Sequence, residues 1–295
     1  MAIQIRPFTD NDLPNIAKQL NETYHDTYEF SPYTVDGFHS WLQESRLKIV
    51  VAEEDGNFLG TAAYHDGHWG EEIEWLAVSD GPNKKLIENM FVIELEKFVR
   101  DMRIFTPIDF DSPKIDEWIE RGYKAEGGLY HMIIALDDLK PVLEMPESMV
   151  LRSLRPDEGK ALVEAVNAGF GWGRLKLGDI QKWKIDSPPF SEDWVQVAET
   201  DGKIVSVVVA KPDTSYNEAF GGKRGYLGPA STLAEYRCKN LAFTLTVRAL
   251  NLLFERGMGS AALFTSETNV ASMTLLQKLG FKIGHHWKFM RKNLP

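Results

Sequence analysis

The sequence predicts an α+β protein made of two tandem domains, each built on a mixed sheet with α/β-type connections. First, 295 residues are many for one core and few for three, so two domains of about 145 residues are expected. Second, the sequence repeats itself at an offset of 146 residues. Third, both halves show the same order of strand and helix patterns. We therefore expect one domain over residues 1–145 and a second over residues 146–295.

Two short matches define the repeat. The stretch IQIRPFTDND, from Ile3, aligns with MVLRSLRPDE, from Met149. At the same offset, VAEEDGNFLG, from Val51, aligns with VAETDGKIVS, from Val197. Matches about 45 residues apart are not expected to share one offset by accident, which indicates an internal duplication. We expect the boundary in LDDLKPVLEMPES, which is acidic and contains two prolines.

Each half contains the same elements in the same order. A first strand, at 3–6 or 150–152, precedes an amphipathic helix. Two β-rich runs then flank an Asp-Gly pair, which predicts a hairpin. A further strand, a long helix, a short strand, a short helix and two closing strands complete the half. The expected ranges are strands 72–78 and 225–232, long helices 84–100 and 239–256, short strands 103–108 and 260–265, and closing strands such as those within 282–291.

Glycines mark the ends of several elements. Both short helices stop at a glycine followed by an aromatic residue, at Gly122 and Gly280. These glycines are 158 positions apart, so the second half holds about twelve extra residues, which we assign to the Gly-rich stretch 211–225. That stretch is either a substrate lid or an uninvolved insertion. The stretch AGFGWGRLK, from Ala168, is expected to be a loop after the first helix, without a second helix directly behind it.

Composition and charge exclude several classes. The net charge of −10 divides into −15 for residues 1–146 and +5 for residues 147–295. The second half therefore suits a polyphosphate ligand better, whereas its scattered cations give no nucleic-acid patch. One cysteine excludes an internal disulfide, and neither His65 with His68 nor His285 with His286 has a third convincing ligand, so no metal is expected. Without an export signal or an 18-residue apolar run, we expect a cytoplasmic protein that does not bind membranes.

The stretch TLAEYRCKNLAFTLT, residues 232–246, places two cations at the start of a long helix. A helix start already carries about half a positive charge and unpaired N–H groups, so cations are unfavourable there. A bound phosphate would resolve this conflict. The alternative is that Arg237 and Lys239 are ordinary solvated side chains.

Within this stretch, EYRCKNLAF resembles the pyrophosphate loop of the GNAT superfamily of acyl-CoA-dependent N-acetyltransferases, with Asn240 in place of the first glycine. The order of elements fits the same family over both halves. The resemblance implies that the loop amides hold the CoA pyrophosphate and that the preceding strand pairs with the pantetheine arm. The cofactor-binding residues it implies are Ala230, Ser231, Thr232, Arg237, Cys238, Lys239, Asn240, Leu241, Ala242 and Phe243.

A second segment, TSETNVASMTLLQKLGF, is similar to the next motif of that family. The resemblance implies that Asn269 helps to hold the cofactor, although an N-cap role would also explain it. The family often places a tyrosine four residues before the glycine, as the acid that protonates the CoA thiolate. Leu276 stands there, and Trp118 stands at the matching position of the first half. With VSDGPNKKLIENMF in place of the loop, the first half is expected to be a degenerate domain that keeps the fold and lacks the cofactor.

The implied reaction transfers acetyl from acetyl-CoA to a primary amine of a small-molecule or peptide acceptor. The amine must lose a proton, and we expect Glu267 to serve as the base in preference to Glu218. The alternative function is a non-catalytic CoA-binding or partner-binding module on a degenerate fold. Another acyl-CoA donor also stays open.

Overall fold

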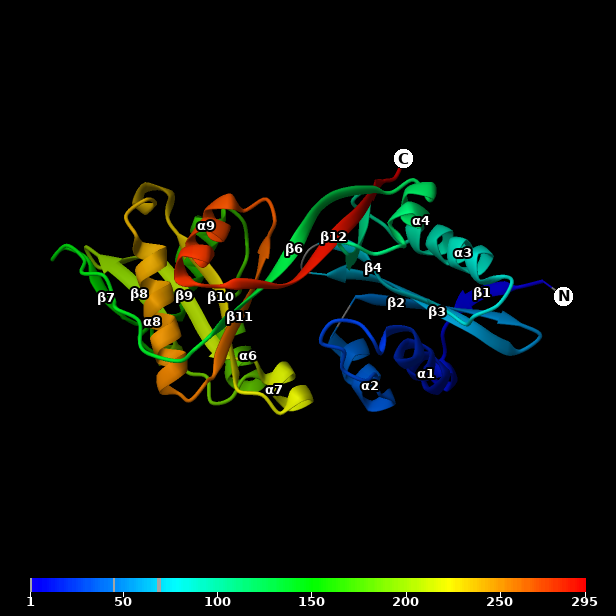
Figure 1. The fold of residues 1–295 in the computed structure, drawn as a ribbon, viewed down its shortest axis with the longest axis horizontal. Helices are drawn as coiled ribbons and strands as arrows, with labels where there is room; N and C mark the ends of the chain where they lie inside the picture. Colours follow the sequence, from blue (N-terminus) through cyan, green and yellow to red (C-terminus); the bar gives the residue numbers. More distant parts are fainter. Residues whose placement is uncertain (1, 45, 68–69) are drawn as a thin grey trace. The chain divides into compact units, whose positions relative to one another are not determined.

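The structure is a computed structural model that describes residues 2–44, 46–67 and 70–295 (Figure 1). It contains two compact units. Unit 1 comprises Met1–Leu129 and His286–Pro295, and unit 2 comprises Tyr130–His285. The division expected near residue 145 follows the repeat, whereas the compact units follow the strands: β6 (Lys124–Ala135) begins in unit 1 and ends in unit 2, and β12 (Lys282–Asn293) does the reverse.

Unit 1 is a sheet with helices on both faces. The strand order is β1-β2-β3-β4-β5-β12. Helices α1 and α2 cover one face, and α3 and α4 cover the other (Figure 1). Side chains of β2 alternate accordingly: Val51 packs with α1 residues such as Leu13, while Val50 packs with α3 residues such as Phe91. The bounds are β1 Gln4–Pro7, β2 Leu47–Glu54, β3 Asn57–Gly67, β4 Gly70–Val78, β5 Arg103–Asp109, η1 Asp10–Asp12, α1 Leu13–Tyr24, α2 Val35–Glu44, α3 Lys84–Glu96 and α4 Ile115–Glu120.

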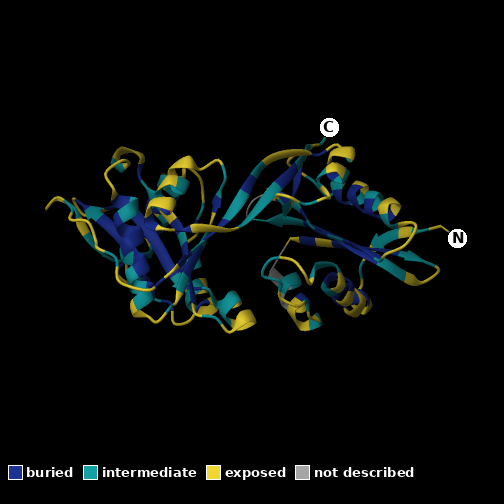
Figure 2. Ribbon diagram, in the orientation of Figure 1, coloured by how far each residue is buried: buried dark blue, intermediate teal, exposed yellow. Residues whose placement is uncertain are grey.

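Unit 2 repeats this plan. Its strand order is β6-β11-β10-β9-β8-β7, and the central strands are the most buried part (Figure 2). Helix α8 contributes eight buried residues, in agreement with its apolar sequence. The bounds are β7 Val150–Ser153, β8 Val195–Thr200, β9 Lys203–Pro212, β10 Arg224–Thr232, β11 Ser260–Ser266, α5 Gly159–Phe170, α6 Asp179–Asp186, α7 Thr214–Phe220, α8 Leu241–Glu255, α9 Val270–Leu279, η2 Glu192–Trp194 and η3 Ala234–Tyr236.

The same ion-pair network occurs in both units. In unit 1, Arg6 bonds Asp12 at 2.8 Å and Glu53 at 2.8 Å. In unit 2, the residues 146 positions later form the same network, with Arg152 bonded to Glu158 at 2.7 Å and to Glu199 at 2.8 Å. In each case the arginine ties the first strand to the following helical turn and to the hairpin. A shared offset for three interacting residues agrees with the duplication.

Turns and helix ends follow the sequence signals closely. Asp55-Gly56 and Asp201-Gly202 both have positive φ, as the predicted two-residue hairpins require. Gly122 and Gly280 end their helices in the left-handed region, with φ of 86° and 96°.

Three expectations about the elements were wrong. Each half ends in one long strand, β6 or β12, and not in two, because no turn interrupts it. The stretch 211–225 contains α7, whose Asn217 side chain donates to the Arg224 carbonyl at 2.9 Å and accepts from the Arg224 backbone N–H at 2.7 Å. The loop after α5 leads to a second helix, α6, after the eight residues 171–178.

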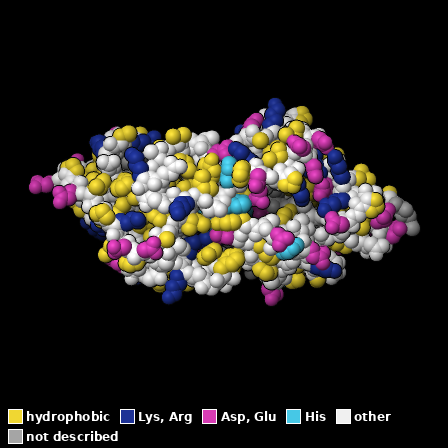
Figure 3. Space-filling view, in the orientation of Figure 1, with side chains coloured by type: hydrophobic (Ala, Val, Ile, Leu, Met, Phe, Trp, Pro, Cys, Tyr) yellow, Lys and Arg dark blue, Asp and Glu magenta, His cyan; other side chains and the backbone are white. Residues whose placement is uncertain are grey.

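In the described ranges, no helix combines the length and the apolar character that crossing a bilayer requires. Asp and Glu side chains are spread over the visible face of unit 1 (Figure 3), in agreement with the acidic first half.

Candidate functional site

The centre of the candidate site is the point where β10 and β11 cease to pair. Among the described residues, their parallel ladder has three pairs, which end at Tyr226 with Ala262. Strand β10 continues to Thr232 and β11 to Ser266, while β10 stays paired with β9 as far as Thr232 with Ser206. The edge of β10 that faces β11 therefore offers backbone N–H and C=O groups to another extended chain.

A bulge in β10 lies at this point. The register with β9 shifts between Leu227 and Ala230, across Gly228 and Pro229. Pro229 contributes no N–H, and Gly228 has a φ of 142°, which a side chain would oppose. The Tyr226 ring lies alongside, since a Cβ on Gly228 would be 3.4 Å from Tyr226 Cε1 and 4.0 Å from its hydroxyl oxygen. The phenol of Tyr226 is thus next to the bulge.

Beyond β10, the chain forms an exposed loop and enters α8. Cys238 and Asn240 both have positive φ, 60° and 58°, and Arg237, Cys238, Lys239 and Asn240 are all exposed. Asn is among the residues that tolerate this conformation best after glycine, which explains its presence at the motif's glycine position. The amides of Leu241, Ala242 and Phe243 form the first helical turn and have no acceptor within the helix. Amides without an acceptor in the helix and the positive end of a 15-residue helix suit an anion.

The two loop cations differ in what they contact. Arg237 donates to the carbonyls of Thr232 at 3.3 Å and Gly169 at 2.9 Å, so it holds the loop against the end of α5. Lys239 lies 4.9 Å from the Tyr236 ring and is exposed. Lys239 is therefore the cation that can reach an incoming phosphate without giving up a backbone contact.

The end of α5 also packs closely on β10. A Cβ on Gly169 would be 2.8 Å from the Ser231 Cβ, so only glycine permits this approach. Ser231 Oγ is buried and has no hydrogen-bond partner among the described residues. A buried hydroxyl without a partner is costly, and a polar ligand along β10 would satisfy it. The Thr232 hydroxyl, in contrast, bonds Ser206 at 2.7 Å.

The remaining predicted residues lie at the other end of β11. Asn269 caps α9 by accepting from the Ser272 backbone N–H at 3.1 Å, which is the capping role considered above. Glu267 follows the last residue of β11 and is partly buried. Five residues separate it from Ala262, a distance of about 16 Å along an extended strand. Glu267 is thus far along β11 from the bulge, and Leu276 is buried in the core.

Sequence reasoning missed three residues around the bulge. Lys211, on β9, is the register partner of Tyr226 on β10. The charge of Arg174, in the loop after α5, lowers the pKa of Lys211 and that of Tyr226. Burial raises the pKa of Tyr226, and a hydrogen bond from the Phe264 backbone opposes that rise. A tyrosine two positions before Gly228-Pro229 was the available sequence signal; nothing local pointed to Lys211 or Arg174.

The equivalent position of unit 1 is built differently. Asp80 precedes α3 and pairs with Lys84 at 2.7 Å, so a carboxylate precedes this helix where two exposed cations precede α8 in unit 2. Asn83, which precedes α3, has a φ of −97° and not the left-handed conformation of Asn240. Both features disfavour a phosphate at this helix start.

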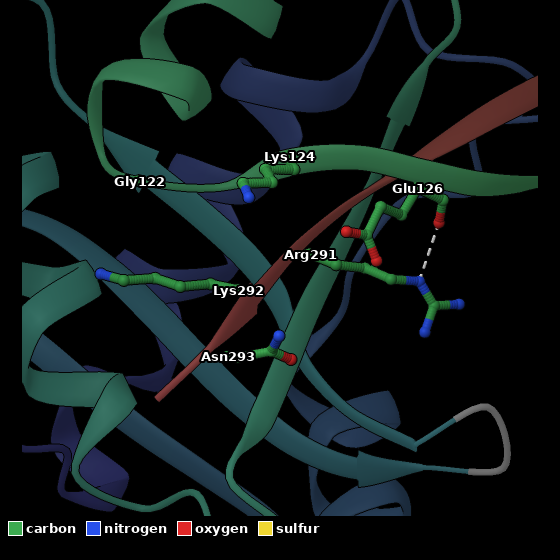
Figure 4. A pocket seen from close by; sticks show the side chains of 6 residues that line it. All are labelled: Gly122, Lys124, Glu126, Arg291, Lys292 and Asn293. Atoms are coloured by element: carbon green, nitrogen blue, oxygen red, sulfur yellow. Dashed lines mark hydrogen bonds between the residues drawn. The ribbon is translucent and has the colours of Figure 1, made fainter. Parts of the chain in front are cut away.

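Two cavities lie in unit 1. One, of about 150 Å³, is lined by Gly122, Lys124, Glu126 and residues 291–293, and Arg291 there donates to the carbonyl of Glu126 at 2.9 Å (Figure 4). The second, of about 390 Å³, lies over α3 and α4. Both are lined by unit 1 residues alone, and neither includes a residue predicted for the cofactor.

A cluster of titratable residues joins β3 to β4 in unit 1. His65 Nδ1 lies 3.3 Å from Glu72 Oε1 and 3.1 Å from Glu74 Oε2. Both carboxylates raise the pKa of His65 to about 9, so the imidazolium forms an ion pair with them at neutral pH. The three ligand atoms lie within 4.8 Å of one another, a grouping that could hold a metal ion. The other histidine considered with His65, at position 68, lies outside the described residues.

Comparisons with known proteins agree with this geometry. Residues 158–281 match the model of the acetyltransferase (GNAT) family. The mycothiol acetyltransferase of Renibacterium salmoninarum is 25% identical over 173 residues, which are 54% of this chain and 49% of that protein. The aligned region therefore spans about half the length of this curated relative.

Solved structures resemble the chain over nearly its full length. A GCN5-related N-acetyltransferase from Sphaerobacter thermophilus has a TM-score of 0.71 at 17% identity, with 98% of this chain and 95% of that chain covered. A tandem GNAT protein from the clavulanic acid biosynthesis pathway has a TM-score of 0.67 at 14% identity, with 99% and 98% covered. At such identities the likeness concerns the fold, and it confirms the expected α+β tandem architecture.

Proposed function

Because this chain belongs to the GNAT acetyltransferase family, we propose that it is an N-acetyltransferase that moves an acetyl group from acetyl-CoA to a primary amine. Residues 146–295 form the cofactor-binding domain in this proposal, and residues 1–145 form the degenerate one. The observation that carries it is the end of the β10–β11 ladder at Tyr226, followed along the chain by an exposed loop and by the unpaired amides at the start of α8. The acceptor is a small-molecule or peptide amine.

The proposed cofactor contacts follow from these elements. The pantetheine arm runs along Ala230, Ser231 and Thr232, where the Ser231 hydroxyl has no hydrogen-bond partner among the described residues. The pyrophosphate lies on the amides from residue 238 to 243, with Lys239 beside it. Arg237 holds the loop in position through its hydrogen bond to the Gly169 carbonyl. Asn269 continues to cap α9 and helps to hold the cofactor from the end of β11. These contacts place the acyl group next to the bulge at Gly228.

The chemistry then takes place beside Tyr226. The neutral amine nitrogen attacks the thioester carbon, the C–N bond forms, and the nitrogen releases one proton to water. The C–S bond breaks, and the thiolate accepts a proton. Backbone donors of the bulged strand stabilise the oxyanion, since they are already oriented. Tyr226 is the phenol next to the bulge, and its raised pKa keeps it protonated and able to donate to the thiolate. We propose that Tyr226 takes the role of the acid missing at Leu276. Glu267, which the sequence led us to expect as the base, lies about 16 Å along β11 from the level of Tyr226, so the proposal does not give it that role.

Ligand-induced stabilisation tests the cofactor site. Acetyl-CoA at 100 times its Kd should stabilise the folded protein by about 2.7 kcal/mol and raise the melting temperature. Lys239→Glu should weaken acetyl-CoA binding by about tenfold, because it places a negative charge beside the pyrophosphate. Lys160→Glu, the same charge change at an exposed position of α5, is the matched control. No shift with the wild type at millimolar acetyl-CoA would overturn the proposal.

Thiol release distinguishes transfer from mere binding. The alternative, a non-catalytic CoA-binding or partner-binding module, draws support from the buried Leu276 at the family's tyrosine position. Release of CoA thiol that depends on an added amine would establish the transferase. Tight acetyl-CoA binding without release across a broad amine panel would favour the module.

A further inference from the structure

Lys211 lies beside Tyr226 in unit 2, and the Arg174 charge, in the loop after α5, acts on the pKa of both residues. The Lys211 ammonium lies 5.5 Å from the Tyr226 ring centroid and 5.7 Å from that of Trp183, on α6. The Arg174 guanidinium lies 6.0 Å from the Phe170 ring. In the part of the chain that the structure describes, neither cation has a carboxylate oxygen within ion-pair distance. Aromatic faces attract these charges but do not neutralise them.

The nearby carboxylates already have other partners. Asp213 accepts from Arg224 at 2.7 Å, and Asp186 lies 3.5 Å from Lys182. Asp179 is the carboxylate whose charge raises the pKa of Arg174, and it accepts a hydrogen bond from the Lys176 backbone N–H at 2.8 Å. The charge of Lys211 and Arg174 is therefore left without a close counter-charge from unit 2.

Holding the two cations together is unfavourable in the absence of a ligand. Burial lowers the pKa of Lys211 and that of Arg174, and Arg174 lowers the pKa of Lys211 further. Like charges that share a partly desolvated site oppose each other, and an anion between them removes the opposition. An arginine fork and a lysine ammonium are the usual partners of carboxylate and phosphate groups.

The position of the pair indicates which ligand it serves. Lys211 and Tyr226 form a register pair on β9 and β10, two residues before the bulge at Gly228. The cofactor loop follows β10 at its opposite end, after Thr232. The pair therefore lies on the acceptor side of the proposed acyl position.

We propose that Arg174 and Lys211 bind the anionic group, a carboxylate or a phosphate, of a small acceptor, so that the acceptor is an amine with a negatively charged substituent. This inference rests on the proposed acetyl transfer. The anion lies against Trp183 and Tyr226, and the amine points toward the bulge.

Matched acceptors test the inference. L-leucine is compared with L-leucinamide, and phosphoethanolamine with ethanolamine, so that each pair differs in the anionic group. Lys211→Met and Arg174→Gln should each raise KM for the anionic member by about 10- to 100-fold, the loss expected for a charge-assisted hydrogen bond. KM for the neutral member and for acetyl-CoA should change less than threefold. The members of each pair also differ in the pKa of their amine. This difference cancels when KM of a variant is divided by KM of the wild type for the same acceptor.

Controls separate binding from folding. Lys211→Arg should restore most of the preference, because it keeps the cation, and Lys160→Met should have no effect. The anionic acceptor whose KM rises more in the variants, L-leucine or phosphoethanolamine, shows whether the bound anion is a carboxylate or a phosphate. Equal losses with anionic and neutral acceptors, while acetyl-CoA still raises the melting temperature, would overturn the inference and leave the transferase standing.

A second measurement needs no turnover. Lys211 should react with an amine-directed label, followed by peptide mass spectrometry, because its lowered pKa leaves more of it neutral. N-acetyl-leucine should slow this reaction at least threefold, whereas N-acetyl-leucinamide should not. Protection by neither compound, nor by inorganic phosphate, would overturn the inference even if acetyl transfer is never found.

Discussion

At the scale of single residues, Tyr226 connects the two halves of the proposed site. Its hydroxyl is next to Gly228, where the acyl group is proposed to lie, and its ring contacts the Lys211 ammonium on the acceptor side. A phenol with a raised pKa stays protonated at neutral pH, so it can donate but cannot accept a proton from the amine. The acid and the base must then be different groups.

The substitution Tyr226→Phe tests this role. It should lower kcat by about 10- to 100-fold with little change in the KM for acetyl-CoA, since it removes the proton donor and keeps the ring. Glu267→Gln, about 16 Å along β11 from the level of Tyr226, should lower kcat less than threefold. Steady-state thiol release measures both. A large loss with Glu267→Gln and none with Tyr226→Phe would reverse the assignment.

At the scale of elements, the β3–β4 hairpin of unit 1 carries a charge cluster with a clear pH dependence. His65 has a pKa of about 9 in the folded protein, above its ordinary value of 6.5. A raised histidine pKa contributes stability that is fully present below about pH 6.5 and is lost as the pH rises through about 9. Burial raises the pKa of Glu72, and the hydrogen bond with His65 opposes that rise.

Chemical unfolding over a pH series checks the cluster. The free energy of unfolding of the wild type should fall between pH 6.5 and 9.5, with a slope of at most about 1.4 kcal/mol per pH unit from one proton. His65→Gln should show a flatter profile over the same window and should be less stable at pH 6.5. Parallel profiles for the two proteins would show that the ion pair does not stabilise the hairpin.

At the scale of the whole molecule, the compact units are not two consecutive halves of the chain, because residues 286–295 belong to unit 1. Strand β12 pairs with β5 in unit 1, from Trp287 with Asp109 to Asn293 with Arg103. Phe289 and Met290 of this strand are buried there. The last ten residues of the chain thus complete the core of the N-terminal unit.

Deleting residues 286–295 should therefore destabilise unit 1 more than unit 2. Losing the seven register pairs of β12 with β5 and two buried side chains should lower the melting temperature of unit 1 by about 10 °C or more. The acetyl-CoA-dependent shift should persist in unit 2. Differential scanning calorimetry would resolve the two transitions, with removal of Pro295 alone as the control. A truncated protein with the same unfolding transitions as the full chain would contradict the assignment of β12 to unit 1.

Local patterns in the sequence determined the duplication, the order of elements and the loop before α8. These features depend on residues close in the chain: an Asp-Gly turn, a helix-ending glycine, or Asn240 at a position that needs positive φ. Arg6 and Arg152 are 146 positions apart, as the repeat requires, and the structure shows that both form the same ion-pair network.

Only the tertiary structure decided which distant residues meet at the site. Lys211, Arg174 and Tyr226 are brought together by the β9–β10 register and by the loop after α5, and β12 joins unit 1 from the opposite end of the sequence. Strand pairing and register depend on side chains far apart in the chain, so no local spacing encodes them. The loop proposed to bind the cofactor is continuous in sequence and could be located in advance, whereas the proposed acceptor side is assembled by folding and could not.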